Sequence, residues 1–210
     1  MARKIGFKRA YVGIIDEDTE TLVKGEDGLS ESGIFEINAQ TSLGTIQAAI
    51  TGLAPTATKI WGSNQNVDVS QQGAGNAQMT MSANDIPAGI VNKLAGMKQD
   101  EETKAWYLDA DTKPAKSAVI LESQDSKGRP YYFALVKGTF GPEEVTLNTN
   151  TETQQITTDA MTFSALQRKK DSKVYLTWLP EDNPKVDDVL KAVFPEDSTS
   201  NPKSTTTSKK

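Results

Sequence analysis

The sequence predicts an α+β domain that is mainly β, built on antiparallel sheet with one or two short flanking helices. Strand-like segments rich in β-branched residues alternate with turn-forming clusters along most of the chain. Two short stretches, near residues 84–96 and 183–195, instead repeat apolar residues at helical spacing. Strands, one helix, more strands and a second helix is an order typical of α+β domains.

The first third of the chain is expected to hold an arm and then strands. Residues 1–32 form a polar arm with one apolar stretch at residues 11–15, and strand-like residues begin at Ile34. Farther on, apolar and polar residues alternate on both sides of a small polar segment, so a hairpin is predicted over residues 66–82. Its turn would contain Gln72, Gly73, Ala74, Gly75 and Asn76.

A short helix and two strands are predicted next. The helix occupies residues 84–96, where Asn84 or Asp85 can cap it and Pro87 fits its first turn. Its apolar residues Ile86, Ile90 and Leu94 are spaced by four. Gly96 ends this helix. Strands at residues 118–122 and 131–140 follow, and a turn at residues 125–128 joins them.

The segment at residues 131–136 is apolar at every position. A strand with one solvated face would alternate, so this strand is expected to be covered on both faces. Either a helix of the same chain or a neighbouring subunit would supply the second cover.

The last third of the chain is expected to contain more strands and a second helix. Residues 145–167 form either two strands joined by the polar residues 148–155 or one long hairpin. The helix has Asn183 as its cap and Pro184 in its first position, and Pro195 ends it.

These elements predict three parts in the chain. Residues 1–32 are the N-terminal arm, and residues 33–195 are the folded domain. Residues 196–210 are mostly Ser, Thr, Lys and Pro with nothing apolar to bury, so a disordered tail is predicted there.

The composition excludes most enzyme classes. The chain has no histidine and no cysteine, so histidine-assisted nucleophiles, thiolate metal sites and ordinary zinc sites are ruled out. The net charge of −5 disfavours tight binding to phosphate backbones. No stretch is long and apolar enough to be a signal peptide or to span a membrane, so synthesis in the cytoplasm is expected. We therefore predict a protein that is not an enzyme and needs no cofactor.

Other patterns have simpler interpretations than a chemical site. Acidic clusters at residues 16–18 and 109–111 lack the glycine and distal glutamate of a calcium loop, so solvated turns are expected. Trp61, Trp106 and Trp178 would serve a sugar-binding face only if the fold made them coplanar.

Several segments resemble the major tail protein family of long, flexible-tailed, non-contractile bacteriophages of Gram-positive bacteria. They occur in order along nearly the whole chain apart from its C-terminal tail. These segments are residues 6–12, 24–30, 50–55, 59–64, 83–87, 132–133, 135–140, 147–151, and Leu190 with 193–195.

The resemblance implies a β-sandwich with a flanking helix and a structural role in the virion tail. Six copies would form a ring, and stacked rings would form a tube through which DNA passes without specific binding. The expected partners are other copies of the chain, the tape-measure protein, and the distal tail and tail-terminator proteins. A monomeric carbohydrate- or surface-binding β-domain is the alternative.

Contacts between subunits are expected in three flexible features: the arm 1–32, the turn around residues 73–76 and the polar loop 148–155. The tail at residues 196–210 would lie outside the tube, since a disordered segment inside would obstruct DNA. The candidate contact residues are Tyr11, Gly73, Ala74, Gly75, Asn76, Asn148, Thr149 and Asn150.

Overall fold

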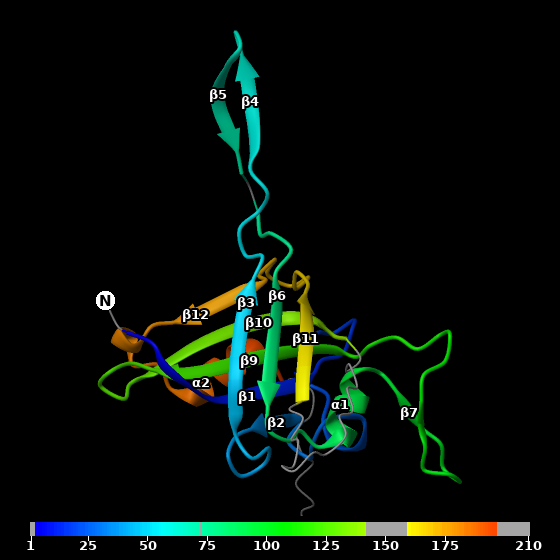
Figure 1. Cartoon of the computed structure of the whole chain (residues 1–210). Helices are drawn as coiled ribbons and strands as arrows, with labels where there is room; N and C mark the ends of the chain where they lie inside the picture. The colour runs from blue at the N-terminus through cyan, green and yellow to red at the C-terminus, as the bar shows by residue number, and fades with distance from the viewer. Residues whose placement is uncertain (1–2, 72, 142–158, 197–210) are drawn as a thin grey trace, which may run out of the picture.

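The computed structural model describes residues 3–71, 73–141 and 159–196, and its centre is an eight-stranded antiparallel sheet (Figure 1). The main-sheet strands are β1 (Ile5–Ile14), β2 (Ile34–Ile37), β3 (Thr45–Thr51), β6 (Gln78–Ala83), β9 (Lys116–Gln124), β10 (Pro130–Phe140), β11 (Asp159–Ala165) and β12 (Tyr175–Trp178). Two small hairpins pair β4 (Thr58–Gly62) with β5 (Gln65–Ser70), and β7 (Lys98–Gln99) with β8 (Trp106–Tyr107). The helices are α1 (Ala88–Leu94) and α2 (Val186–Val193), with short 3-10 turns η1 (Gly25–Asp27) and η2 (Pro180–Asp182).

The sheet folds into two layers because β10 changes partners along its length. The strand order is β2-β1-β9-β10-β11-β6-β3, with β12 also paired to β10. The first half of β10 pairs with β12, and after a register shift between Leu135 and Gly138 its end pairs with β11. As a result β3, β6 and β11 cross over β1, β9 and β10 (Figure 1). The prediction of a mainly β, antiparallel domain with two helices is confirmed.

The space between the layers is filled by one apolar cluster. Met79 and Phe163 point into it from the β3–β6–β11 layer, and Val12 and Leu135 point into it from the other layer. The rings of Phe140 and Phe163 meet edge to face, 4.8 Å apart.

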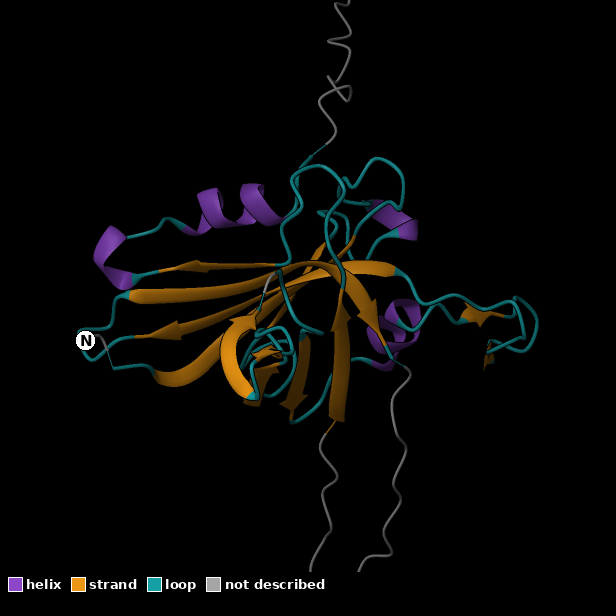
Figure 2. Cartoon of the chain, turned by 90° about the horizontal axis from the view of Figure 1, so that it is seen from above, coloured by secondary structure: helices purple, strands orange, loops and turns teal. Residues whose placement is uncertain are grey.

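A second apolar cluster lies on the opposite face of β9 and β10, beneath α2 (Figure 2). Val189 and Val193 of the helix are buried against Ile120, Tyr132 and Ala134. The predicted double cover of residues 131–136 is therefore confirmed, and it is a helix of the same chain that provides the second cover.

Both helices form close to where they are predicted, but α2 begins later. Asn183 adopts a left-handed conformation, φ 45°, and ends η2, while Lys185 directly precedes α2. The prediction of Asn183 as its cap and Pro184 as its first residue is wrong, because asparagine tolerates the left-handed turn that separates the two helical segments.

The first strand lies inside the segment predicted as an arm. β1 pairs with β2 on one side and with β9 on the other, so residues 5–14 form an inner strand. Successive side chains point to opposite faces of the strand, so Tyr11 lies in the cluster beneath α2 and Val12 in the cluster between the layers. The sequence-based boundary at residue 32 therefore does not coincide with a structural boundary.

The predicted hairpin over residues 66–82 is wrong. β5 pairs with β4 instead, through a tight turn in which Ser63 and Asn64 both have positive φ. β6 pairs with β3 and β11. The alternating pattern does mark two strands here, but pairing depends on partners that the pattern does not specify.

Candidate assembly surfaces

The β4–β5 hairpin stands away from the sandwich as a projection (Figure 1). Every described residue of its two strands is exposed. Its exposed apolar side chains include Ile60, Val67 and Val69, and Trp61 with 66% of its surface accessible. A two-stranded hairpin is marginally stable alone in water, and an apolar patch of this kind is typical of a contact surface.

Residues 73–76 lie at the base of this projection rather than at its tip. The Gly75 N–H donates to the Leu53 carbonyl, 3.2 Å away. A β-carbon on Gly75 would stand 2.3 Å from the backbone oxygens of both Gly52 and Ala54, so only glycine fits where the two legs approach. Their role as subunit contacts stays a prediction.

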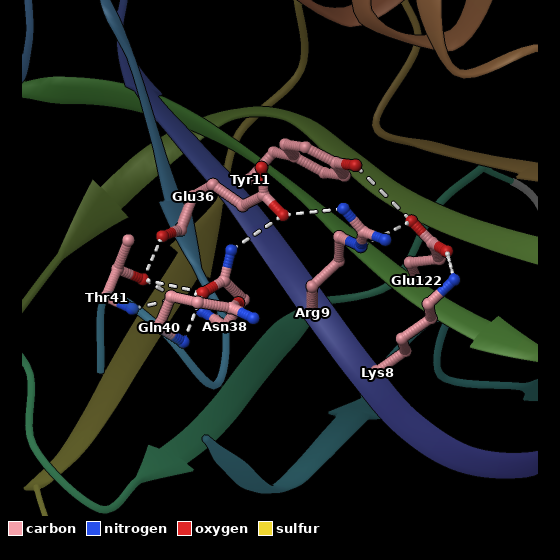
Figure 3. Close-up of polar contacts among 8 residues, drawn as sticks. All are labelled: Lys8, Arg9, Tyr11, Glu36, Asn38, Gln40, Thr41 and Glu122. Carbon is pink, nitrogen blue, oxygen red and sulfur yellow. Dashed lines mark hydrogen bonds and ion pairs between the residues drawn. The ribbon is translucent and has the colours of Figure 1, made fainter. Parts of the chain in front are cut away.

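Tyr11 is placed inside the fold, with 7% of its surface exposed. Its hydroxyl donates to Glu122, 3.3 Å away, and Figure 3 shows Lys8 and Arg9 converging on the same carboxylate. Burial and the nearby Glu122 carboxylate raise the pKa of Tyr11. Burial likewise raises the pKa of Tyr132 to about 12. A contact between subunits through Tyr11 stays a prediction, and only a small part of the residue is exposed for it.

The same polar network ties β1 to both of its neighbours. Arg9 donates to Glu36 of β2 at 2.7 Å and pairs with Glu122 of β9 at 3.2 Å (Figure 3). Glu36 also accepts from Asn38, which begins the turn after β2. Two of the basic residues that made this segment resemble a polar arm, Lys8 and Arg9, are thus paired within the sheet.

The predicted contact residues Asn148, Thr149 and Asn150 lie outside the described residues.

Two strands end the order of the main sheet. Among the described residues, β3 pairs only with β6, and β2 pairs only with β1. Edge strands present unpaired backbone donors and acceptors that another chain can extend. Both strands therefore lie at edges of the main sheet, and in β2 the carbonyls of Ile34 and Glu36 accept hydrogen bonds from the hydroxyls of Ser30 and Thr41.

The three tryptophans do not share a face. Trp61, Trp106 and Trp178 belong to β4, β8 and β12, which are strands of three separate sheets. From sequence, Trp61 is predicted as part of a possible sugar-binding face and belongs to the resembling segment 59–64, but the projection that carries it is missed. The Ser63-Asn64 pair between two strand-like runs is the signal that could locate this hairpin.

Within residues 3–71, 73–141 and 159–196, no three acidic side chains are arranged to hold a metal ion. Over the same residues, no helix has the length and apolar character needed to cross a membrane.

An apolar projection and open sheet edges are typical of a structural protein that associates with other chains. Comparison with known families gives the assignment. The family described as "phage tail tube protein" matches residues 1–202, and the chain belongs to this family. It is therefore a structural component of a phage tail and not an enzyme, as the sequence predicted.

Among solved structures, the chain is similar to one described as "Cryo-EM structure of the anti-feeding prophage (AFP) baseplate, 6-fold symmetrised". The match covers 85% of this chain and 97% of that chain, with 9% sequence identity and a TM-score of 0.41. No curated protein matches the chain.

Proposed function

We propose that six copies of the chain form a ring, and that rings stack into the tube of a long, flexible, non-contractile tail. The tube would conduct the genome into a Gram-positive host during ejection. The observation that carries this proposal is the β4–β5 projection, whose apolar side chains have no cover within the described part of the chain.

Ring closure accounts for the two open sheet edges. In a ring, one edge of each subunit faces the opposite edge of the next, so β2 and β3 each gain a neighbour. Closure also removes the aggregation hazard of unpaired strands. Contacts from ring to ring are head to tail, and such heterologous contacts extend into a tube.

The projection is the natural contact between neighbouring copies. Trp61 and its apolar neighbours would become buried against the next copy, with additional contacts from residues 73–76, residues 148–150 and Tyr11. The tape-measure, distal tail and tail-terminator proteins are the remaining partners, and assembly in the host cytoplasm precedes incorporation into the virion.

The proposal is tested by negative-stain electron microscopy and light scattering over a range of protein concentrations. Wild-type protein is expected to form rings or hollow tubes with six-fold end views. Trp61→Ala removes a central apolar contact worth about 2 kcal/mol, which raises the concentration needed for assembly roughly thirtyfold.

The matched control is Leu179→Ala. Leu179 is also exposed but lies next to η2, away from the projection, so assembly should be unchanged. A chain that stays monomeric even with its tail-tip and tape-measure partners would instead favour the alternative, a monomeric surface-binding β-domain.

A further inference from the structure

A pocket opens on the face of the main sheet that carries α2, beside the turn that joins β9 to β10. It has a volume of about 270 Å³, and four strands and helices contribute to its lining. We term it the Tyr132 pocket. The lining residues that bear on its chemistry are Lys8 and Arg9 of β1, Glu122 of β9, Pro130 and Tyr132 of β10, and Val186 of α2.

The hydroxyl of Tyr132 has no partner in the described part of the chain. The residue is 3% exposed, and none of the described residues forms a hydrogen bond with this hydroxyl. Every fully enclosed side-chain oxygen and nitrogen of the described residues is hydrogen-bonded, so the hydroxyl is not enclosed and opens into the pocket. In a single subunit its partner is water, and an acceptor on another molecule can replace that water.

The Tyr132 pocket favours an acidic ligand. Glu122, the one acidic residue among the described residues that line it, already binds both Lys8 and Arg9. Arg9 also binds Glu36, but the Lys8 side chain is 51% exposed, so its ammonium can bind a second carboxylate. The Tyr132 hydroxyl is a further donor in the same pocket. Since a carboxylate only accepts hydrogen bonds, it suits both donors.

The opposite end of the molecule carries an acidic hairpin. The β7–β8 hairpin projects at one end, and the turn between β9 and β10 lies at the other (Figure 1, Figure 2). The Asp100 carboxylate accepts the N–H groups of Glu102 at 3.1 Å and Thr103 at 2.7 Å, which holds the hairpin's turn in one conformation. Glu101 and Glu102 at this tip are exposed, and neither forms an ion pair with a described residue.

The hairpin and the pocket also match in their apolar parts. Tyr107 and Leu108 follow the tip and are 43% and 53% exposed. Pro130 and Val186 supply apolar surface in the pocket. Contact between these groups excludes water from the charged pair, and an ion pair that is shielded from water is stronger than an exposed one.

We propose that the β7–β8 tip of one copy binds in the Tyr132 pocket of the next copy, where Glu101 or Glu102 accepts from Lys8 and from the Tyr132 hydroxyl. Because the tip and the pocket lie at opposite ends of the molecule, the contact joins different surfaces of two copies, and repeating it closes a ring. The inference rests on the proposed function and adds to it two surfaces that meet within the ring.

A pair of introduced thiols tests the contact directly, because the chain has no cysteine of its own. Glu102→Cys places a thiol at the tip, and Gln124→Cys places one in the lining of the pocket. Assembled tubes of this double variant are treated with a short bismaleimide and separated on a denaturing gel. Each chain carries both ends of the contact, so a ladder of multimers up to the hexamer is expected. Each single variant can join no more than two chains.

The matched control is Gln124→Cys/Thr80→Cys. Thr80 is exposed but lies on β6, in the other layer of the sandwich, so these tubes should give nothing larger than a dimer. Dispersed subunits of both double variants should stay monomeric, so that the ladder depends on assembly. Tubes of Glu102→Cys/Gln124→Cys that also stop at the dimer would overturn the proposal.

Electron microscopy of the same samples separates this inference from the proposed function. Absence of rings and tubes in wild-type protein and in every variant refutes the ring, and the docking contact with it. Tubes that form normally but give no ladder refute the docking contact alone.

Charge reversal measures what the tip contributes. Glu101→Lys/Glu102→Lys should raise the concentration needed for tube assembly by roughly tenfold, because like charges then meet at the pocket. Glu17→Lys/Asp18→Lys makes the same change of charge at another exposed turn and should leave that concentration nearly unchanged. Equal shifts in the two variants would show that net charge alone is responsible, and would contradict the proposal.

Tyr132→Phe isolates the hydroxyl. Since no described residue binds this hydroxyl, its loss should leave the urea unfolding midpoint of dispersed subunits unchanged. The same change should raise the concentration needed for assembly severalfold, because one hydrogen bond between copies is lost. A lower unfolding midpoint with unchanged assembly would mean that the hydroxyl serves the fold of the subunit, against the proposal.

Discussion

Glu20 and Lys137 form an ion pair in the interior, with 3% and 4% of their surfaces exposed. The Glu20 carboxylate also accepts the backbone N–H groups of Lys169 at 2.8 Å and Lys170 at 3.1 Å. It thereby joins the segment after β1, the register shift in β10 and the turn after β11. The variant Glu20→Gln tests how much this ion pair and its hydrogen bonds stabilise the fold.

The substitution leaves the Lys137 ammonium buried opposite a neutral amide. Breaking one partner of a buried pair costs about 3–5 kcal/mol, and the amide oxygen retains part of the interaction, so about 3 kcal/mol is expected. With a urea m-value of about 2 kcal/mol/M, the unfolding midpoint should fall by roughly 1.5 M. Such a loss is a large share of a typical domain stability of about 5–15 kcal/mol.

The assay is urea unfolding followed by tryptophan fluorescence, at a protein concentration too low for assembly. The double variant Glu20→Gln/Lys137→Met removes the unpaired buried ammonium of Lys137 and should recover much of the lost stability. Lys24→Gln breaks the exposed pair between Lys24 and Glu196 and should leave the unfolding midpoint nearly unchanged, because solvent screens an exposed pair. A Glu20→Gln protein as stable as the Lys24→Gln control would refute the reasoning.

Three further predictions concern pH, packing and the tail. Burial tends to raise the pKa of Glu20, but Lys137 and the two backbone N–H groups lower it overall, and the Arg168 hydrogen bond lowers the pKa of Asp171. The two carboxylates therefore stabilise the fold above the unfolded-state pKa of about 4, and this stabilisation is lost as pH falls through their folded-state pKa values. The urea unfolding midpoint should accordingly fall in acid. The fall should be smaller in Glu20→Gln, which lacks one of the two carboxylates. Gly138→Ala places a β-carbon 2.3 Å from the Ser164 oxygen and 2.4 Å from the Phe163 ring, and thermal melts should show a loss of about 2–3 kcal/mol. Gly89→Ala in α1 meets nothing within 4 Å and should be neutral or stabilising by up to about 1 kcal/mol. Deletion of residues 196–210 should leave tubes intact by electron microscopy, and loss of tubes would contradict an external tail.

Elements set by local signals could be predicted from the sequence. The turn between β9 and β10 forms because Asp125 accepts the N–H groups of Lys127 and Arg129, a role that short acidic side chains fill in turns. α1 follows Pro87 and is ended by Gly96, whose φ of 75° suits glycine. The family could also be predicted from the sequence, because the resembling segments occur in order along the chain and can be recognised without knowing their contacts.

Pairing between distant strands was decided only by the tertiary structure. Both β5 and β6 alternate, and alternation is equally compatible with either partner, so local pattern alone places the hairpin on the wrong residues. The inner position of β1 comes from its pairing with β2 and β9, which brings Arg9 to Glu36 and Glu122, residues far along the chain. Charges that are paired in space are indistinguishable in sequence from solvated ones.

The sequence by itself determined the family, through ordered segments along the chain. It also located both helices and several main-sheet strands, because periodicity, capping residues and turn residues act over a few positions. The tertiary structure decided which faces are covered and which are free. Helix α2 covers one face of β10, while residues from β1, β9, β10 and α2, far apart along the chain, meet around the Tyr132 pocket. Such a pocket exists only when strand order and register are fixed, because each element alone contributes just a few of its side chains.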